Sequence, residues 1–277
     1  MMGYDTDIEY DNSMSDSGRS DLMDDVVKRA GKLIGADDLK EYIERSAALY
    51  KHAGENSSVI LAAVSRMYLL SVNSGDGVRT QVGLIADMLR AMGNVDDLPV
   101  RYFTLKLPDT AFRPVDVNLK TDRDIVLADI ESMGLLNISQ RRLCCIDISA
   151  WIERVESAEF RAVLARLRDH MYDQFVVFWI PAVDEITIRR VREAIGWYVN
   201  VDDIYTPPYS VDEYFEFGMN RLAKMDLRLD DDAMDLFRDC IVDCRGYNTF
   251  WGFNTVKNLI DEMIFTSLME REGSYVL

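Results

Sequence analysis

Hydrophobic positions along the chain follow two different spacings. Runs of consecutive apolar residues predict buried strands, because a strand covered on both faces is apolar at every position. Between these runs, apolar residues recur every three or four positions, which is typical of one face of a helix. The expected strands are the apolar runs of residues 67–72, 143–148 and 175–180, the alternating segment 100–107 and a last strand at residues 197–205. Alternating strands and helices of this kind predict a parallel sheet sandwiched by helices.

Helical spacing dominates at both ends of this region. Before the first strand, residues 22–53 predict two helices that meet at Gly35. After Pro208 the strand pattern stops, and three helical segments follow at about 211–224, 231–245 and 255–272. Ser210 is a suitable N-cap for the first of these, and Asp230 or Asp231 for the second. The sequence therefore predicts an α/β domain at residues 26–207 and a small all-helical domain at residues 208–277.

The first 25 residues have no apolar period. They contain eight acidic residues and one Arg, a composition typical of a disordered tail. Four larger side chains are spread through this acidic segment, and they could dock on a partner: Tyr4, Ile8, Tyr10 and Met14. We therefore expect residues 1–25 to be a disordered acidic tail that either solvates the protein or binds a partner.

The net charge of the chain disfavours some classes of binding partner. Asp and Glu number 48 against 31 Lys and Arg, which gives a net charge of −17. Such a field repels phosphate backbones and anionic membranes, so neither nucleic acid nor a membrane is expected as a partner. No apolar run reaches the length of a membrane span, and the N-terminus does not resemble a signal peptide, so a cytoplasmic location is expected. The four Cys and two His residues form no metal-ligand spacing.

The loop after the first strand holds the candidate chemistry. A phosphate-binding P-loop reads G-x-x-x-x-G-K-[ST], in which the Lys reaches the β/γ-phosphates and the hydroxyl holds Mg²⁺. Here Val78 stands at the Lys position and Arg79 at the hydroxyl position, while Thr80 comes one place late. The candidate nucleotide-binding residues of this degenerate loop are Asn73, Ser74, Gly75, Asp76, Gly77, Val78, Arg79 and Thr80.

Three segments in order carry a resemblance to a known family. They are Lys32-Leu-Ile-Gly-Ala-Asp-Asp-Leu-Lys-Glu-Tyr-Ile43, Tyr209-Ser-Val-Asp-Glu-Tyr-Phe215 and Phe250-Trp-Gly-Phe-Asn-Thr-Val-Lys-Asn258. Together they resemble the AAA+ ATPases, in particular the group of red-type rubisco activase and the stage V sporulation protein K. The resemblance spans residues 26–272. It implies a P-loop NTPase-like AAA+ large domain followed by a helical lid, and assembly of subunits into an oligomer.

The same resemblance marks further catalytic positions, and most have changed. The Walker B strand keeps Asp147, a candidate metal ligand, but Ile148 replaces the carboxylate that would activate water. The nearest carboxylate downstream is Glu153. In the lid, Asn254 falls on the position of the family's sensor Arg. Three residues are available as arginine fingers, although their context differs from the family's: Arg189, Arg190 and Arg192.

Several functions fit these changes. The leading hypothesis is a catalytically degenerate AAA+ subunit, a pseudo-ATPase without a cofactor, that acts as a structural or regulatory partner of an active AAA+ paralogue or of a client protein. An alternative keeps ATP or ADP with Mg²⁺ but hydrolyses it weakly or not at all, with Arg79 as the phosphate cation. A third hypothesis is an adaptor that binds a basic partner through the acidic tail or through the aromatic residues of positions 205–217. Active ATP-driven remodelling would need Thr80 and Glu153 to replace the missing groups.

Overall fold

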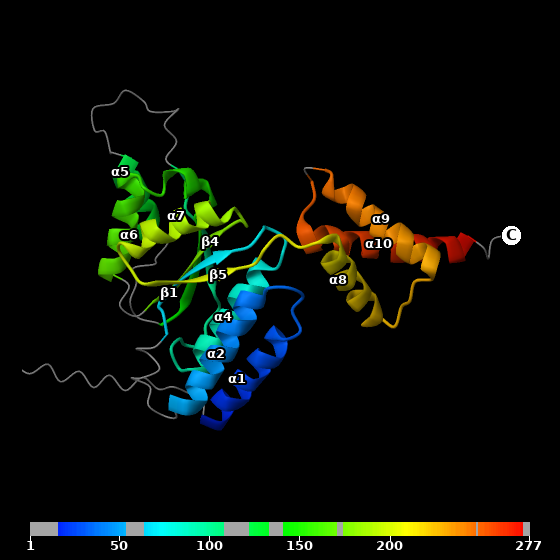
Figure 1. Ribbon diagram of the computed structural model, residues 1–277, viewed down its shortest axis with the longest axis horizontal. Helices are drawn as coiled ribbons and strands as arrows, with labels where there is room; N and C mark the ends of the chain where they lie inside the picture. Colours follow the sequence, from blue (N-terminus) through cyan, green and yellow to red (C-terminus); the bar gives the residue numbers. More distant parts are fainter. Residues whose placement is uncertain are drawn as a thin grey trace, which may run out of the picture.

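The computed structural model describes residues 16–53, 64–107, 122–132, 141–170, 174–247 and 249–273. Its centre is a five-stranded sheet in the order β2-β3-β4-β1-β5, in which every neighbouring pair is parallel (Figure 1). The strands are β1 (Met67–Ser71), β2 (Arg101–Thr104), β3 (Leu143–Asp147), β4 (Phe175–Ile180) and β5 (Val201–Tyr205). The predicted α/β fold class is therefore confirmed.

Helices cover both faces of the sheet. One layer consists of α1 (Asp16–Ala30), α2 (Asp37–Ala53) and α4 (Val78–Ala91), and the other of α5 (Asp122–Ser132), the 3₁₀ helix η1 (Ser149–Arg154), α6 (Ala158–His170) and α7 (Glu185–Gly196) (Figure 1). Successive strand residues point to opposite layers, as the pleat requires. In β1, Tyr68 and Leu70 join the core under α4, whereas Met67 and Leu69 join the core under α6.

The predicted disordered tail is wrong for residues 16–25. These residues form the first part of α1, and the side chains of Met23 and Val26 are fully buried. Met23, Val26 and Ala30 are spaced by three and four positions, so they make an apolar stripe that packs in the core with α2 and α4. The high density of acidic residues around this stripe hid it in the sequence pattern. Residues 1–15 lie outside the described part of the chain.

Two strand predictions were too long. The strand expected over residues 100–107 covers only β2, and the one expected over 197–205 begins at Val201. Helix α7 continues to Gly196, and Trp197 ends it through a backbone bond of 3.2 Å from its N–H to the carbonyl of Glu193. Trp197 is 85% exposed, so its aromatic character does not indicate a buried strand position.

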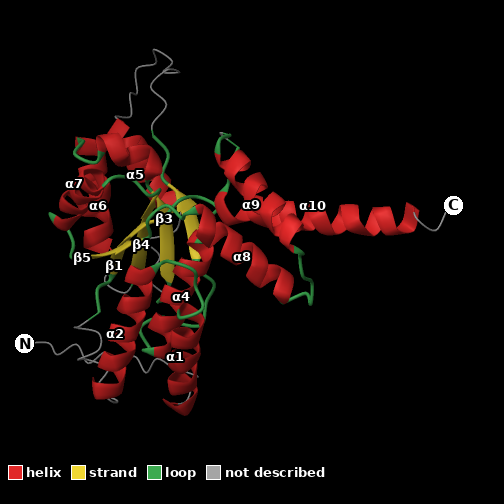
Figure 2. Ribbon diagram, turned by 45° about the vertical axis from the view of Figure 1, so that its right-hand side comes forward, coloured by secondary structure: helices red, strands yellow, loops and turns green. Residues whose placement is uncertain are grey.

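The last three helices form the lid, as predicted. They are α8 (Val211–Ala223), α9 (Asp231–Arg245) and α10 (Gly252–Gly273), and they lie beside the α/β domain, with α10 extending farthest from it (Figure 2). Ser210 caps α8 in a capping box with Glu213, and Asp230 caps α9, which confirms both predicted N-caps. The lid has its own apolar core around Tyr214, Phe237, Ile241, Val256 and Ile260.

Two of the four cysteines are buried in the sheet, and the other two, Cys240 and Cys244, are half-buried in α9. Cys144 and Cys145 are buried on opposite faces of β3, and burial raises the pKa of the Cys144 thiol to about 11 and that of Cys145 to about 12. All four thiols are free. In the described ranges no three His, Cys, Asp or Glu side chains are grouped so that they could hold a metal ion. Over the same ranges, no helix is both apolar and long enough for a transmembrane segment.

Two glycines within helices predict stability changes of opposite sign. A Cβ atom at Gly83 in α4 would meet nothing within 4 Å, so Gly83→Ala should stabilise the protein by about 0.5–1 kcal/mol through helix propensity alone. At Gly218 in α8 the same atom would lie 2.5 Å from the ring of Phe237, which is confined in the lid core. Overpacking costs about 1–3 kcal/mol, so Gly218→Ala should destabilise the lid. Urea denaturation followed by circular dichroism measures both, and a stabilised Gly218→Ala variant would show that the lid core has room.

Candidate functional site between the sheet edge and the lid

The cradle loop, residues 73–80, leaves the carboxyl end of β1 and enters α4. Parallel α/β sheets bind ligands at this edge, where the strand order reverses. The loop is fixed to β4: the N–H of Val72 donates to the carbonyl of Ile180 at 3.0 Å, and the indole of Trp179 donates to the carbonyl of Val72 at 2.8 Å. Asn73 accepts from the N–H of Ala182 through its side-chain oxygen at 3.2 Å. The loop therefore has a defined place at the ligand-binding edge of the sheet.

Two glycines give the cradle loop its turn. Gly75 and Gly77 have φ values of 88° and 90°, in the left-handed region that favours glycine. Gly77 is also the N-cap residue of α4. The backbone of the loop thus turns at both glycines, and its side chains differ from those of the P-loop pattern.

Asp76 lies at the centre of the loop and is only 3% exposed. Its carboxylate accepts hydrogen bonds from the hydroxyl of Tyr214 in the lid at 2.9 and 3.1 Å. The backbone N–H of Phe253, in the first turn of α10, and the side chain of Asn73 also donate to it. Burial raises the pKa of Asp76, while these donors and the positive charge of Arg245 oppose that rise. A negative group of the protein therefore lies buried in the loop where a phosphate would be expected.

The lid approaches the loop so closely that glycine is required on both sides. A Cβ atom at Gly75 would overlap the carbonyl oxygen of Trp251, and one at Gly252 would overlap the carboxylate of Asp76. Gly252 also has a positive φ of 51°. The indole N–H of Trp251 donates to the hydroxyl of Ser74 at 3.0 Å. The start of α10 is thus packed against the cradle loop.

The last three residues of the cradle loop, Val78, Arg79 and Thr80, have different surroundings. Val78 packs against the core of the α1, α2 and α4 layer, so no cation stands at the Lys position. The guanidinium of Arg79 lies over the ring of Tyr102, with its Cζ atom 5.1 Å from the ring centroid. Thr80 is exposed and lines the cavities on both sides of the loop. Of the three, only Thr80 has a side chain that lines both cavities.

Asp147 ends β3 at the same edge. Its Oδ1 atom accepts from the N–H and the hydroxyl of Ser149, at 2.9 and 2.6 Å, and so fixes the start of η1. Ile148, at the position of the catalytic base, is fully buried in the core under α6. Glu153 lies 3.4 Å from the guanidinium of Arg190, and it lines neither cavity beside the loop. The carboxylates among the described residues that line the two cavities beside the loop are Asp76, Asp147 and Glu216.

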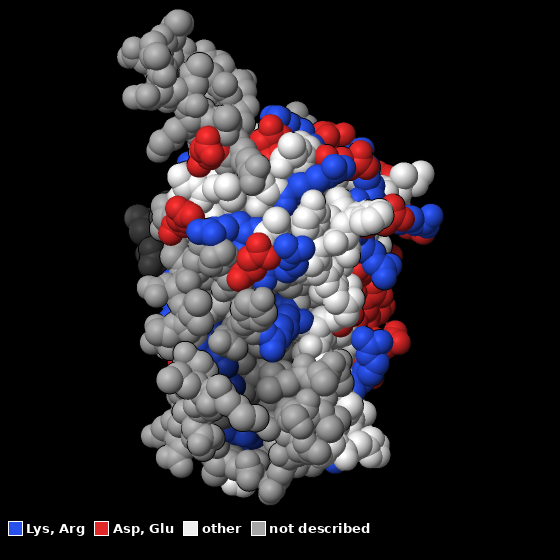
Figure 3. Space-filling model, turned by 90° about the vertical axis from the view of Figure 1, so that its left-hand side faces the viewer, with Lys and Arg blue, Asp and Glu red and all other residues white. Residues whose placement is uncertain are grey.

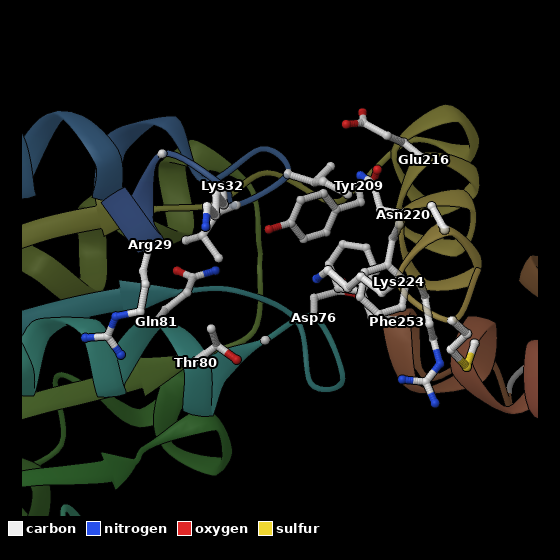
Figure 4. Close-up of a pocket in the computed structure, with 18 residues that line it drawn as sticks. Arg29, Lys32, Asp76, Thr80, Gln81, Tyr209, Glu216, Asn220, Lys224 and Phe253 are labelled. Atoms are coloured by element: carbon white, nitrogen blue, oxygen red, sulfur yellow. The ribbon is translucent and has the colours of Figure 1, made fainter. Parts of the chain in front are cut away.

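Two cavities flank the cradle loop. The larger, of about 1010 Å³, lies between α1 and α8 and is lined by Lys32, Lys224, Tyr209 and Phe253, among others (Figure 4). Figure 4 shows Asp76 and Phe253 at the point where the two domains meet. The smaller cavity, of about 630 Å³, brings Asp147 together with Asn254 and Lys257 of α10. The tertiary structure thus gathers the predicted loop, Asp147 and Asn254 at one place.

The predicted arginine fingers are engaged within the chain. Arg189 pairs with Glu185 at 2.8 Å, Arg190 donates to the carbonyl of Ile152 at 3.1 Å, and Arg192 pairs with Asp203 at 3.1 Å.

Most of the aromatic residues proposed as a docking surface also make contacts within the chain. Tyr209 and Tyr214 are buried in the lid core, with Phe215 and Phe217 packed against it. Those four rings mainly hold the lid together.

Three site residues were missed from the sequence: Tyr214, Trp251 and Lys257. Lys257 lies one helical turn after Asn254, so helical spacing from the predicted lid position could have found it. Tyr214 and Trp251 act on a loop about 140 and 175 positions earlier in the chain, and no local pattern links such distant residues.

Comparison with known proteins finds similarity at the level of fold. No family model and no curated protein matches the chain. Its backbone is similar to that of a point mutant of RuvB from Thermotoga maritima (14% identity, TM-score 0.49), and the match covers 86% of this chain and 67% of that one. It is also similar to the Hsp104–ADP complex of S. cerevisiae (12% identity, TM-score 0.49; 95% and 50% covered) and to AMPPCP-bound DnaA from Aquifex aeolicus (13% identity, TM-score 0.41; 84% and 65% covered). The chain spans half to two thirds of the length of these structures. Its own strand order and helical layers define a parallel α/β domain followed by a small all-helical domain.

Proposed function

We propose that this chain is a catalytically degenerate AAA+ subunit that acts as a structural or regulatory interaction partner and does not turn over ATP. The observation that carries this proposal is the buried carboxylate of Asp76 inside the cradle loop. A triphosphate placed in this loop would face that negative group without the Lys that normally balances the phosphate charge. The buried Ile148 removes the base on the metal side of the site.

The lid surface supports a role in protein interaction. Of 13 large hydrophobic side chains that the described residues expose, nine belong to the lid: Met225, Leu227, Leu236, Val242, Tyr247, Trp251, Phe265, Leu268 and Met269. Phe265, Leu268 and Met269 lie on one face of α10, at positions i, i+3 and i+4. Exposed apolar residues gathered in this way are typical of surfaces that bind other proteins. We therefore place the partner surface, for an AAA+ paralogue or a client protein, on the lid.

Surface charge supports a protein partner over nucleic acid. On the face shown in Figure 3, Lys and Arg are interspersed with Asp and Glu and form no continuous basic surface among the described residues. Together with the net charge of −17, this arrangement disfavours a phosphate backbone. The same charge disfavours binding to an anionic membrane surface, and we propose a cytoplasmic location without membrane contact.

A second function is favoured by one observation. The smaller cavity brings two cations, Arg79 and Lys257, together with Asp147 and the aromatic rings of Tyr102 and Trp251, a combination suited to a flat ring that carries an anion. In this alternative the chain binds ATP or ADP there without hydrolysis, with Arg79 as the phosphate cation, and Asp147 provides a weak link to Mg²⁺.

A phosphate-release assay on the full chain tests the proposal. We expect no turnover above background with Mg²⁺-ATP, because each missing group is worth about 10²–10⁴ in rate. Turnover that Asp147→Ala abolishes would contradict the proposal. Calorimetry with ATP and ADP tests the second function, and heat that disappears in Arg79→Ala would support it. Size measurement with and without a catalytically intact AAA+ protein from the same organism tests for a mixed assembly.

A further inference from the structure

One close contact between the two domains is made by a carboxylate that has no counterpart in the P-loop pattern. Asp76 belongs to the α/β domain, but both Tyr214 and Phe253, two of its donors, belong to the lid. The N–H of Phe253 lies in the first turn of α10, where a helix has unpaired N–H groups and a partial positive charge. The carboxylate thus bonds one lid side chain and one lid helix end at the same time.

Residues of both the cradle loop and the lid favour the contact that Asp76 makes. Gly75 and Gly252 allow the two backbones to approach, and any side chain at either position would push the lid away. The indole of Trp251 adds a second polar contact, to Ser74. Tyr214 remains a donor at neutral pH because burial and the nearby carboxylate of Asp76 raise its pKa well above the usual value. The two glycines, the bond between Trp251 and Ser74 and the hydroxyl of Tyr214 therefore all contribute to one interdomain contact.

We propose that Asp76 is a built-in clamp that fixes the lid on the cradle loop, so that this chain holds its closed interdomain arrangement without a bound nucleotide. The carboxylate supplies within the chain the anion that a ligand would otherwise bring to this loop. The inference rests on the proposed function, in which the cradle loop does not take a triphosphate. It adds that the loop has become the attachment point of the lid, which keeps the lid surface in one orientation for a partner.

Hydrogen exchange of the full chain, measured by mass spectrometry without nucleotide, tests the clamp. In Asp76→Ala we expect exchange of residues 250–256 and 73–77 to become at least about 10-fold faster, because the variant loses several charge-assisted hydrogen bonds at once. Exchange in β4 should stay unchanged, because the backbone hydrogen bonds of that strand to β1 and β3 do not involve Asp76. Tyr214→Phe should give a smaller increase in the same two segments, and the double variant should match Asp76→Ala alone.

Asp147→Asn is the matched control, because it changes an acidic residue at the same sheet edge whose partner, Ser149, lies in its own domain. It should leave exchange of the lid unchanged. Unchanged exchange at residues 250–256 in Asp76→Ala would overturn the clamp. Equal acceleration in β4 in both Asp76→Ala and Tyr214→Phe would also overturn it, because Asp76 would then support folding in general. Since no nucleotide is present, this outcome is independent of the phosphate-release assay.

Discussion

Ile148→Glu is expected to lower the free energy of unfolding by about 3–5 kcal/mol, the usual cost of a buried charge without a partner. The substitution restores the carboxylate that a hydrolysing relative would have after Asp147. However, the side chain at position 148 is fully buried among the apolar residues under α6. The variant should therefore lose stability without gaining ATP turnover. Urea denaturation and the phosphate-release assay measure the two effects.

The loss caused by Ile148→Glu should depend on pH. Burial raises the pKa of the introduced carboxyl above its unfolded value of about 4.3, so the folded state prefers the neutral form. The loss is then smallest at acid pH and grows as pH rises from the unfolded pKa toward the raised one. Ile148→Val is the control, with an expected cost of about 0.5–1.5 kcal/mol and no pH dependence of its own. A stable variant with measurable turnover would contradict both the burial argument and the proposed function.

Trp151→Ala should destabilise the α/β domain by about 3–5 kcal/mol, the range for removing a large buried aromatic side chain. Trp151 lies in η1, shortly after Asp147, and is fully buried. Its ring packs beside Phe160, with the centroids 5.7 Å apart, and its indole N–H donates to the carbonyl of Leu105 at 2.9 Å. The side chain therefore joins η1 and α6 to the end of β2. Urea denaturation followed by far-UV circular dichroism measures the loss.

Trp151→Phe separates the two contributions at this position. It keeps most of the buried ring and removes the hydrogen bond, so we expect a loss of about 1–3 kcal/mol from the unpaired carbonyl of Leu105. If the Ala and Phe variants lost the same free energy, the cavity would contribute nothing and the packing argument would fail. Because Trp151 follows the Asp147 turn, both variants should also loosen the bonds between Asp147 and Ser149.

Two predictions of the fold from the sequence failed, one at residues 16–25 and one at Trp197. The sequence predicted helices over residues 22–53, but the acidic residues up to position 25, among which Met23 lies, suggested a tail. The core that Met23 and Val26 enter is formed by α2 and α4, and the sequence pattern of residues 16–25 holds no information about that neighbour. Trp197 failed in the opposite way: its aromatic side chain suggested a strand, and its exposure in the structure shows that no core lies over it.

The sequence alone determined the elements whose signal is local. The three apolar runs, the helical spacing between the strands and the caps Ser210 and Asp230 all follow from neighbouring residues, because periodicity and capping act over a few positions. The tertiary structure decided which distant residues contact the cradle loop. Asp76 reaches Tyr214 only because the chain returns after β5 and sets the lid over the loop. Contacts between residues so far apart depend on how whole domains pack, and this packing made an acidic loop residue the link between them.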